Sequence, residues 1–228
     1  MLFQAMFPAG GENQNPYRIF FPIGIFGILY GMTRMLLPFS PDNVYWHREA
    51  MIGLFLVPIS VGFLFTAGPR FFASYPAKNR EVGFMFSSFL FVIAMSLFNL
   101  RLLYSIGMVV LLFQLVLFVS RRYFSRRSGN PIFASFIFLG PTSGFLGNVA
   151  GLISFFTPDP VWGELHKSLY LHGMFWILFF GVGVKFFPML TLSTRSLTKE
   201  PSKYVQIVSK SHQLWGVVGL LLLITFVV

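Results

Sequence analysis

The sequence of 228 residues contains no cysteine. Disulfides, thiolate-ligated iron–sulfur clusters, a c-type haem attachment motif and a cysteine nucleophile are therefore excluded. Charge is also scarce, because charged residues make up 11% of the chain and only seven residues are acidic. A soluble domain of this length carries roughly a quarter charged residues. A surface that faces lipid explains this deficit, whereas a surface that faces water does not.

Several functional signatures are missing as well. The sequence has no nucleotide-binding loop, no Ser/His/Asp arrangement and no carboxylate pair, so hydrolysis and phosphoryl transfer have no support. No acidic residue falls deep within a predicted span, which argues against a typical proton-driven transporter. The N-terminal stretch lacks the basic start and apolar core of a signal peptide, and we expect it to remain as a short tail.

Long hydrophobic runs dominate what is present. Hydrophobic residues make up 55% of the chain, 31 residues are Phe, and the mean hydropathy is +0.72. A spanning helix needs about 20 mostly apolar residues, so we expect an all-α, polytopic transmembrane helical bundle of about seven helices. It would form a single integral membrane domain over residues 1–228. The predicted spans are residues 19–37, 46–67, 82–98, 102–119, 132–155, 168–191 and 206–228.

Short connections and prolines refine this outline. Only Asn99, Leu100 and Arg101 separate the third and fourth spans, which predicts a tight antiparallel hairpin. Pro58 is expected to kink the second span, and Pro141 to loosen the fifth, where small residues also suit a close helix–helix contact. No internal repeat is predicted.

The basic residues orient the bundle. Twelve of the 17 fall on one side of the predicted membrane and four on the other. The twelve are Arg18, Arg70, Lys78, Arg80, Arg121, Arg122, Arg126, Arg127, Arg195, Lys199, Lys203 and Lys210. The positive-inside rule then places the N-terminus in the cytoplasm and the C-terminus outside. The net charge of +10 lies in short loops, so it indicates contact with lipid head groups, with no role in nucleic-acid binding.

Three of the four histidines fall in the outer leaflet. His47 opens the second span, His166 lies in the loop before the sixth, and His172 lies one turn inside the sixth. His212 is expected at the cytoplasmic start of the last span. Lys185 is expected in the cytoplasmic half of the sixth span, with its amine reaching toward the interface. The same outer layer contains Arg34, Arg48, Glu49, Arg101 and Glu164.

Such a layer predicts a cofactor site. A histidine inside a membrane is costly and usually functional, and imidazole is the commonest haem ligand. His47 and His172 could clamp a haem, and Arg34, Arg48 or Arg101 could pair with its propionates. Two alternatives stay open. The histidines could belong only to the aromatic belt at the interface, and His166 could be solvated as readily as it ligates a metal.

The spacing of residues along the predicted helices adds two candidate metal ligands, Met51 and His166. Met51 follows His47 by four residues on one helical face, and a His–Met pair can hold haem iron or Cu(I), although Met is more often core filler. His166 and His172 could meet at one metal only if the segment before Ser168 is non-helical.

Three stretches resemble a known family. The run His47–Gly53, followed by Val61–Pro69, is similar to the second helix of NnrS proteins, which are haem- and copper-containing bacterial membrane proteins. The run His172–Lys185 resembles a later family helix, and Pro16–Pro22 resembles the entry to the first. The family's second motif histidine is absent, since Glu49 or Ala50 stands there. The chain thus resembles a short, divergent member.

The resemblance implies a multi-pass protein of the bacterial inner membrane with His47 and His172 as haem or copper ligands. Haem b is the expected cofactor, copper the second. The implied function is to bind a small ligand such as nitric oxide, or to transfer electrons to one, in nitric oxide or nitrosative-stress metabolism. Whether this amounts to an enzyme, and whether the chain forms a homo-oligomer, stays open. The competing hypotheses are a cofactor-free small-solute transporter or channel, and a structural subunit that recruits a cytoplasmic partner.

Overall fold

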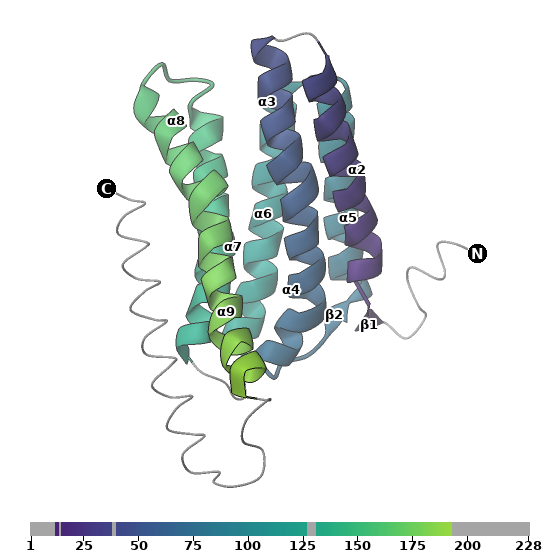
Figure 1. Ribbon diagram of the computed structural model, residues 1–228, viewed down its shortest axis with the longest axis vertical. Helices are drawn as coiled ribbons and strands as arrows, with labels where there is room; N and C mark the ends of the chain where they lie inside the picture. The colour runs from purple at the N-terminus through teal and green to yellow at the C-terminus, as the bar shows by residue number, and fades with distance from the viewer. Residues whose placement is uncertain (1–11, 14, 38–39, 127–130, 193–228) are drawn as a thin grey trace, which may run out of the picture. The chain divides into compact units, whose positions relative to one another are not determined.

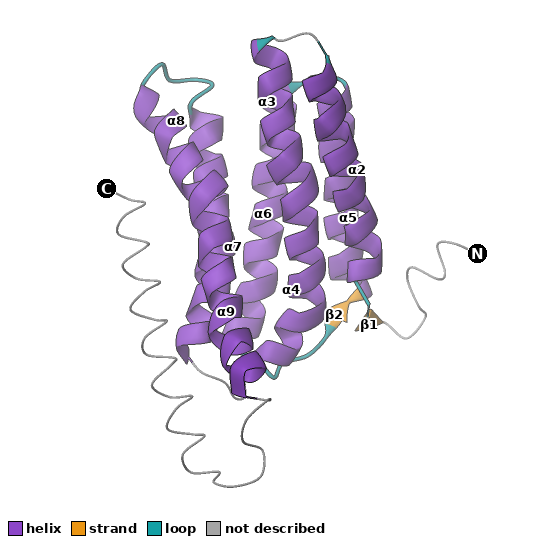
Figure 2. Ribbon diagram, viewed as in Figure 1, coloured by secondary structure: helices purple, strands orange, loops and turns teal. Residues whose placement is uncertain are grey.

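The structure is a computed structural model that describes residues 12–13, 15–37, 40–126 and 131–192. These residues are almost entirely helical (Figure 2). In chain order the elements are β1 Glu12–Asn13, α2 Tyr17–Leu36, α3 Pro41–Glu49, η1 Ala50–Leu56, α4 Val57–Phe71, β2 Ala77–Lys78, α5 Asn79–Leu97, α6 Arg101–Phe124, α7 Pro131–Ile153, α8 Pro160–His166, η2 Lys167–Gly173 and α9 Met174–Leu192. The chain divides into two compact units, Met1–Arg127 and Ser128–Val228, and each is described by itself.

The predicted all-helical membrane architecture is confirmed for the described residues. Five of their helices are long and apolar enough to cross a membrane, and they coincide with the first five predicted spans. The sixth predicted span, 168–191, lies within one continuous helix that begins earlier, at Pro160. The seventh span and His212 lie outside the described residues. The described part of the chain therefore contains five candidate membrane-spanning helices, as expected for a multi-pass membrane protein.

The first unit consists of antiparallel helices (Figure 1). Phenylalanine rings form much of the core between them. Helix α2 lies along the continuous helix α3–η1–α4, and α5 and α6 form a hairpin that meets α4 through α6. Phe20 of α2 contacts Phe65 of α4 and Phe89 of α5, each with 5.7 Å between ring centroids. Phe65 also stacks on Phe118 of α6 at 3.7 Å. Aromatic contacts thus connect α2, α4, α5 and α6.

Two left-handed residues end helices of this unit. Asn99, with a φ of 57°, follows α5, and Ala73, with a φ of 47°, follows α4. At each place two backbone amides return to the last turn of the helix, as in a Schellman motif. The turn at Asn99 lets α6 begin at Arg101, so the predicted tight hairpin is confirmed. At Ala73 the side chain adopts a conformation that glycine would adopt without strain.

The alternating direction of the helices gives the first unit two distinct ends. The end of the unit that contains α2's first turn and α6's last turn carries most basic residues, and we call it the basic end. The strands β1 and β2 pair there, with Glu12 opposite Lys78 (Figure 1). The opposite end, here the histidine end, contains the last turn of α2, the whole of α3 and the first turn of α6. The predicted separation of charged layers is thus present within this unit.

The second unit is a hairpin of α7 against the continuous helix α8–η2–α9. Pro141 lies inside α7, yet the helix runs unbroken from Pro131 to Ile153, so the expected loosening is not observed. Four glycines of α7 lie against the second helix, at positions 140, 144, 147 and 151. A Cβ added at Gly147 would lie 2.5 Å from the backbone nitrogen of Tyr170. The alternative role for this small-residue stretch, close helix packing, is the one the structure shows.

Both units contain a π-helical segment. In η1 the Val57 N–H donates to Ile52 O, and at the end of η2 the Met174 N–H donates to Leu169 O, each five residues back. Pro58 explains the first segment, because a proline lacks an N–H and its ring collides with the carbonyl four residues earlier in a regular helix. The wider π turn relieves that collision, and the kink expected at Pro58 stays a prediction. We find no such local cause for η2.

Candidate histidine site

His47 is anchored to the backbone of the neighbouring helix. It lies on α3, seven residues after the N-cap Ser40, whose hydroxyl accepts a hydrogen bond from Asn43 N at 3.1 Å. Its Nδ1 lies 2.8 Å from the carbonyl oxygen of Gly31 on α2. A carbonyl oxygen only accepts, so Nδ1 carries the proton and Nε2 of the neutral ring carries the lone pair. Metal-binding histidines are typically oriented through such a contact at the other ring nitrogen.

Gly31 also makes room for Met51. A Cβ added at Gly31 would lie 3.0 Å from Met51 Sδ and 3.3 Å from Ala50 Cβ. His47 and Met51 therefore both lie against the same turn of α2, as their spacing of four residues predicts. The thioether fills space in the helix–helix contact, which is the packing role left open for it.

Three predicted arginines gather at this end of the first unit, but their charges are not equally engaged. Arg48 Nη2 lies 3.2 Å from Glu49 Oε1, and Arg101 pairs with Asp42 while lying over the Tyr45 ring. Arg34 donates only to neutral groups among the described residues, to Tyr30 OH at 2.7 Å and Asn99 Oδ1 at 2.6 Å.

Arg34 belongs to the same helix as Gly31, whose carbonyl oxygen anchors the imidazole. It follows Gly31 by three residues, so its side chain begins on the same face of α2, about 4.5 Å further along the axis. Arg34 is thus the arginine best suited to an added anion beside His47.

Two side chains near His47 in the sequence lie in the core of the first unit. Trp46 is 1% exposed and packs edge-to-face on Tyr104, with 5.4 Å between the ring centroids. Glu49, expected in the polar outer layer, is 2% exposed, and its backbone carbonyl accepts from Tyr104 OH at 3.2 Å. Arg48 Nε is buried and has no hydrogen-bond partner among the described residues. This end of the unit therefore contains buried charge, which sequence reasoning missed because it treats each span boundary as solvated.

His166 repeats the arrangement of His47 in the second unit. It lies seven residues after the N-cap Asp159, which accepts from Val161 N at 2.9 Å, and its Nδ1 lies 2.9 Å from Gly147 O. The expectation that His166 lies in a loop is wrong, because Asp159 and Pro160 begin a helix that contains it. That signal was present in the sequence, since an Asp before a Pro is a typical helix start. Gly151 makes room for the ring, as a Cβ there would lie 2.6 Å from Nδ1.

His172 lies in η2 on an exposed position. The segment before Ser168 is helical, so the condition under which His166 and His172 could meet at one metal is not met. Within the described parts of the chain no group of three His, Cys, Asp or Glu side chains could hold a metal ion. Lys185 lies in α9, and its side chain is outside the described part.

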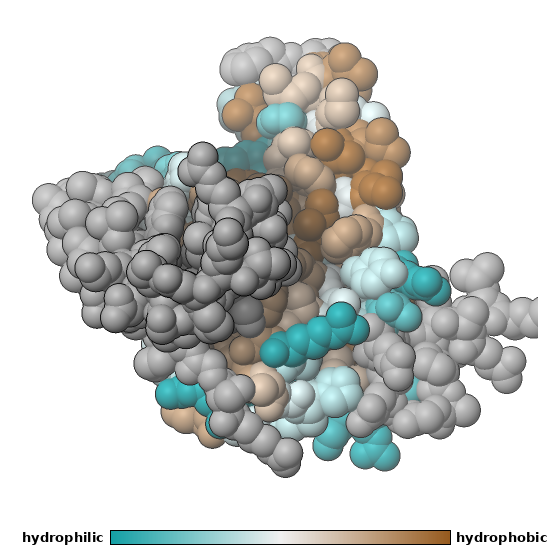
Figure 3. Space-filling view, turned by 60° about the horizontal axis from the view of Figure 1, so that its bottom comes forward, coloured by the Kyte–Doolittle hydropathy of each residue, from teal (hydrophilic) through white to brown (hydrophobic). Residues whose placement is uncertain are grey.

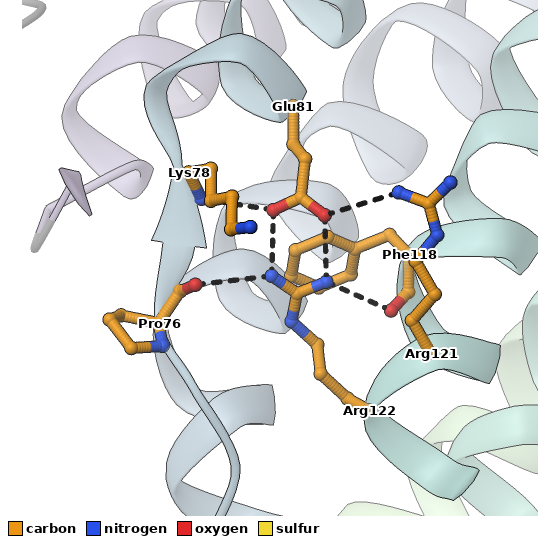
Figure 4. Close-up of polar contacts among 6 residues, drawn as sticks. All are labelled: Pro76, Lys78, Glu81, Phe118, Arg121 and Arg122. Carbon is orange, nitrogen blue, oxygen red and sulfur yellow. Dashed lines mark hydrogen bonds and ion pairs between the residues drawn. The ribbon is translucent and has the colours of Figure 1, made fainter. Parts of the chain in front are cut away.

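The basic end of the first unit holds an ion pair between a buried arginine and a partly exposed glutamate, which the sequence did not predict (Figure 4). Arg122, expected in a cytoplasmic loop, lies in α6 and is 0% exposed. Its Nη1 and Nη2 donate to Glu81 Oε1 at 3.0 Å and Oε2 at 2.7 Å (Figure 4). It also donates to Pro76 O and Phe118 O. A bidentate pair across 41 residues of sequence leaves no local pattern by which it could be found.

Similarity to known protein families shows to which family the chain belongs. The model of the family described as NnrS protein matches residues 13–228, which is nearly the whole chain. The chain belongs to the NnrS family. The family assignment made from the stretches at His47–Gly53 and His172–Lys185 is thereby confirmed. No curated protein and no solved structure shows significant similarity to the chain.

Membership in the NnrS family is consistent with a haem- or copper-containing membrane protein linked to nitric oxide. The residues at the histidine end of the first unit fit such a group. An imidazole presents its Nε2 lone pair to a metal, and an arginine without an acidic partner among the described residues offers charge to a carboxylate.

Proposed function

We propose that this NnrS-family chain is a haem b protein of the bacterial inner membrane, in which Nε2 of His47 would hold the haem iron. The observation that carries the proposal is the hydrogen bond from His47 Nδ1 to Gly31 O, which fixes the tautomer and the direction of the ring. Bound haem would supply reversible binding of a small diatomic ligand such as nitric oxide, or one-electron transfer.

Arg34 would pair with a haem propionate. Its guanidinium has only Tyr30 OH and Asn99 Oδ1 as partners among the described residues, and both are neutral. Arg48 and Arg101, the other two candidates, each have an acidic partner already. A propionate at Arg34 would therefore gain a charge-assisted hydrogen bond without separating an existing ion pair.

His172 is proposed as a further haem ligand, and His166 and Met51 as candidate copper ligands. Support for His172 comes from its place in a π-helical segment, since such segments are frequent at functional sites. Support for His166 is its anchored ring, and for Met51 its position beside Gly31.

An absorption spectrum with metal analysis of the protein purified in a neutral detergent tests the proposal. We expect a Soret band and iron, both lost in His47→Ala and in His47→Asn. Asn can still donate to Gly31 O, so this variant should keep the stability of the parent while losing the iron ligand. A folded parent protein without colour or metal would contradict the proposal and support a cofactor-free transporter or structural subunit. A full Soret band in His47→Ala would exclude His47 as a ligand.

Single substitutions of the other candidates separate the metals. Loss of iron in His172→Ala would support its role at haem, and loss of copper alone in His166→Ala or Met51→Leu would support a separate copper site. Unchanged metal content in any of these variants would remove that residue from the proposal. Far-ultraviolet circular dichroism of each variant shows whether the helices remain.

A further inference from the structure

A cavity of about 460 Å³ lies at the basic end of the first unit. Its walls come from α4, the segment before α5, α5 itself and α6. One part of the wall is cationic and contains Lys78, Arg80 and Arg121. The rest is apolar and includes Phe65, Phe84 and Leu117. Figure 3 turns this end toward the viewer and shows hydrophilic surface bordering hydrophobic surface.

Glu81 is the acidic residue of the cavity wall, and its charge is already compensated. Buried Arg122 contacts both carboxylate oxygens, and the backbone N–H of Lys78 donates to Oε2 at 2.9 Å (Figure 4). Arg121 lies further away, with Nη1 3.9 Å from Glu81 Oε1, and its side chain is 61% exposed. Arg80 has no acidic partner among the described residues and is exposed. The cavity therefore presents uncompensated positive charge.

The cationic and apolar side chains follow the same order on two antiparallel helices. On α5, Phe84 follows Arg80 by four residues toward the middle of the helix, and on α6, Leu117 precedes Arg121 by four residues. Residues four apart share a helix face and are separated by about 6 Å along the axis. Phe84 is 69% exposed and Leu117 38%, so both present apolar surface. Each helix thus offers a cation near its end and an apolar side chain one turn deeper.

We propose that this cavity binds an anionic phospholipid, with the phosphate at Arg80 and Arg121 and the start of an acyl chain along Phe84 and Leu117. The order of charge and apolar surface matches the order of phosphate and acyl chain in a bilayer, which a free anion does not require. The predicted cytoplasmic position of this end agrees, because anionic lipids attract juxtamembrane basic residues on that side. The ion pair of buried Arg122 with Glu81 positions the N-terminus of α5 beside α6. The site is independent of the haem proposed at the histidine end.

Native mass spectrometry of the full chain in neutral detergent tests the site. The probes are phosphatidylglycerol and phosphatidylcholine with identical acyl chains. We expect preferential retention of one phosphatidylglycerol, and retention about 25-fold weaker in Arg80→Gln/Arg121→Gln, because each basic residue near an anionic surface contributes about fivefold. The matched control is Arg18→Gln/Arg126→Gln, which removes two charges outside the cavity wall and should keep the preference.

Two further measurements distinguish a lipid from a free anion and from general surface charge. Phe84→Ala should weaken phosphatidylglycerol retention, and inorganic phosphate alone should neither bind nor compete at millimolar concentration. Equal loss in both double variants would overturn the proposal in favour of diffuse attraction. Competition by inorganic phosphate, with Phe84→Ala unchanged, would overturn the lipid assignment in favour of a soluble phosphate site. If the arginine variants fail to fold, phosphatidylglycerol retention by Phe84→Ala still tests the lipid site, because unchanged retention would contradict it.

Discussion

The two units contain histidine-bearing hairpins that are built alike but differ in their surroundings. The first hairpin is α2 against α3–η1–α4, and the second is α7 against α8–η2–α9. In each hairpin, the second helix begins with an N-cap residue followed by a proline, and a histidine stands seven residues after the N-cap. The ring of this histidine is hydrogen-bonded to a glycine carbonyl oxygen of the first helix, which is rich in glycine. In each, a π-helical segment begins within three residues after the histidine. The shared geometry fixes an imidazole on a neighbouring backbone carbonyl.

The surroundings differ in charge. Near His47 lie three arginines, one of which has only neutral partners among the described residues. Beside His166, Lys167 pairs with exposed Glu164 at 2.6 Å, so no charge is left over within this pair. Anchoring of an imidazole is therefore common to both hairpins, whereas among the described residues an arginine with only neutral partners accompanies the anchored histidine in the first hairpin alone. Four comparisons between variants test this distinction.

The largest effect is expected from Gly27→Ala in the first hairpin. A Cβ at this position would lie 2.0 Å from the backbone oxygen of Leu54, and two backbones would have to separate to admit it. The free energy of unfolding should fall by ~3 kcal/mol or more, because the added Cβ meets backbone atoms and no flexible side chain that could move away. Titration with SDS, followed by circular dichroism, measures it.

Gly68→Ala is the control for Gly27→Ala, since a Cβ there meets nothing within 4 Å. This variant should be as stable as the parent or up to ~1 kcal/mol more stable. Equal stability of Gly27→Ala and Gly68→Ala would show that α2 does not pack this closely on η1.

Gly151→Ala should have the next largest effect, in the second hairpin. The added Cβ would lie 2.6 Å from His166 Nδ1, so the ring must move and its hydrogen bond to Gly147 O is lost. We expect a cost of ~1–3 kcal/mol with the haem spectrum unchanged. Gly163→Ala, whose Cβ would meet nothing within 4 Å, is the control on the same unit. A lost Soret band in a folded Gly151→Ala protein would make the second hairpin as important for haem as the first.

The sequence predicted those parts of the molecule that are encoded locally. Hydrophobic runs located five spans, and the Asn99–Arg101 connection predicted a hairpin turn. Arg122 could not be placed, because its position in the core depends on Glu81, 41 residues away. The π-helical segments could not be placed either, since a widened turn is compatible with the same apolar pattern as a regular one.

The candidate site was predicted in its chemistry but not in its geometry. His47 and the arginines around it share one end of the first unit, as the assignment to one layer predicts. The likeness of the two hairpins was missed, because it rests on hydrogen bonds to glycine carbonyls and leaves few identical residues. The helix start at Asp159 and Pro160 was readable, and reading it would have corrected the loop assigned to His166.

His166→Ala should lower the stability moderately, through loss of the hydrogen bond that anchors the His166 ring. Loss of the hydrogen bond to Gly147 O should cost about 1 kcal/mol of stability, in the same range as loss of the His47 bond to Gly31 O. The two variants should differ in iron, which is lost in His47→Ala and kept in His166→Ala. Thermal unfolding and iron analysis of the same preparations compare them. Parallel loss of iron would remove the functional distinction between the hairpins.

The smallest effect is expected at the helix caps. Ser40→Ala removes a hydroxyl that accepts from Asn43 N, and Asp159→Ala removes a carboxylate that accepts from Val161 N. Each should cost about 0.5 kcal/mol of stability, and Asp159→Ala up to a few tenths more, because its charge also interacts with the helix dipole. Salt screens exposed charges, so at 1 M salt the two costs should become equal. Asp159→Ser should show the cost of the charge alone. If Ser40→Ala costs more than Asp159→Ala at low salt, the cap of the first hairpin contributes through packing beyond its hydrogen bond, and the two helix starts are not equivalent.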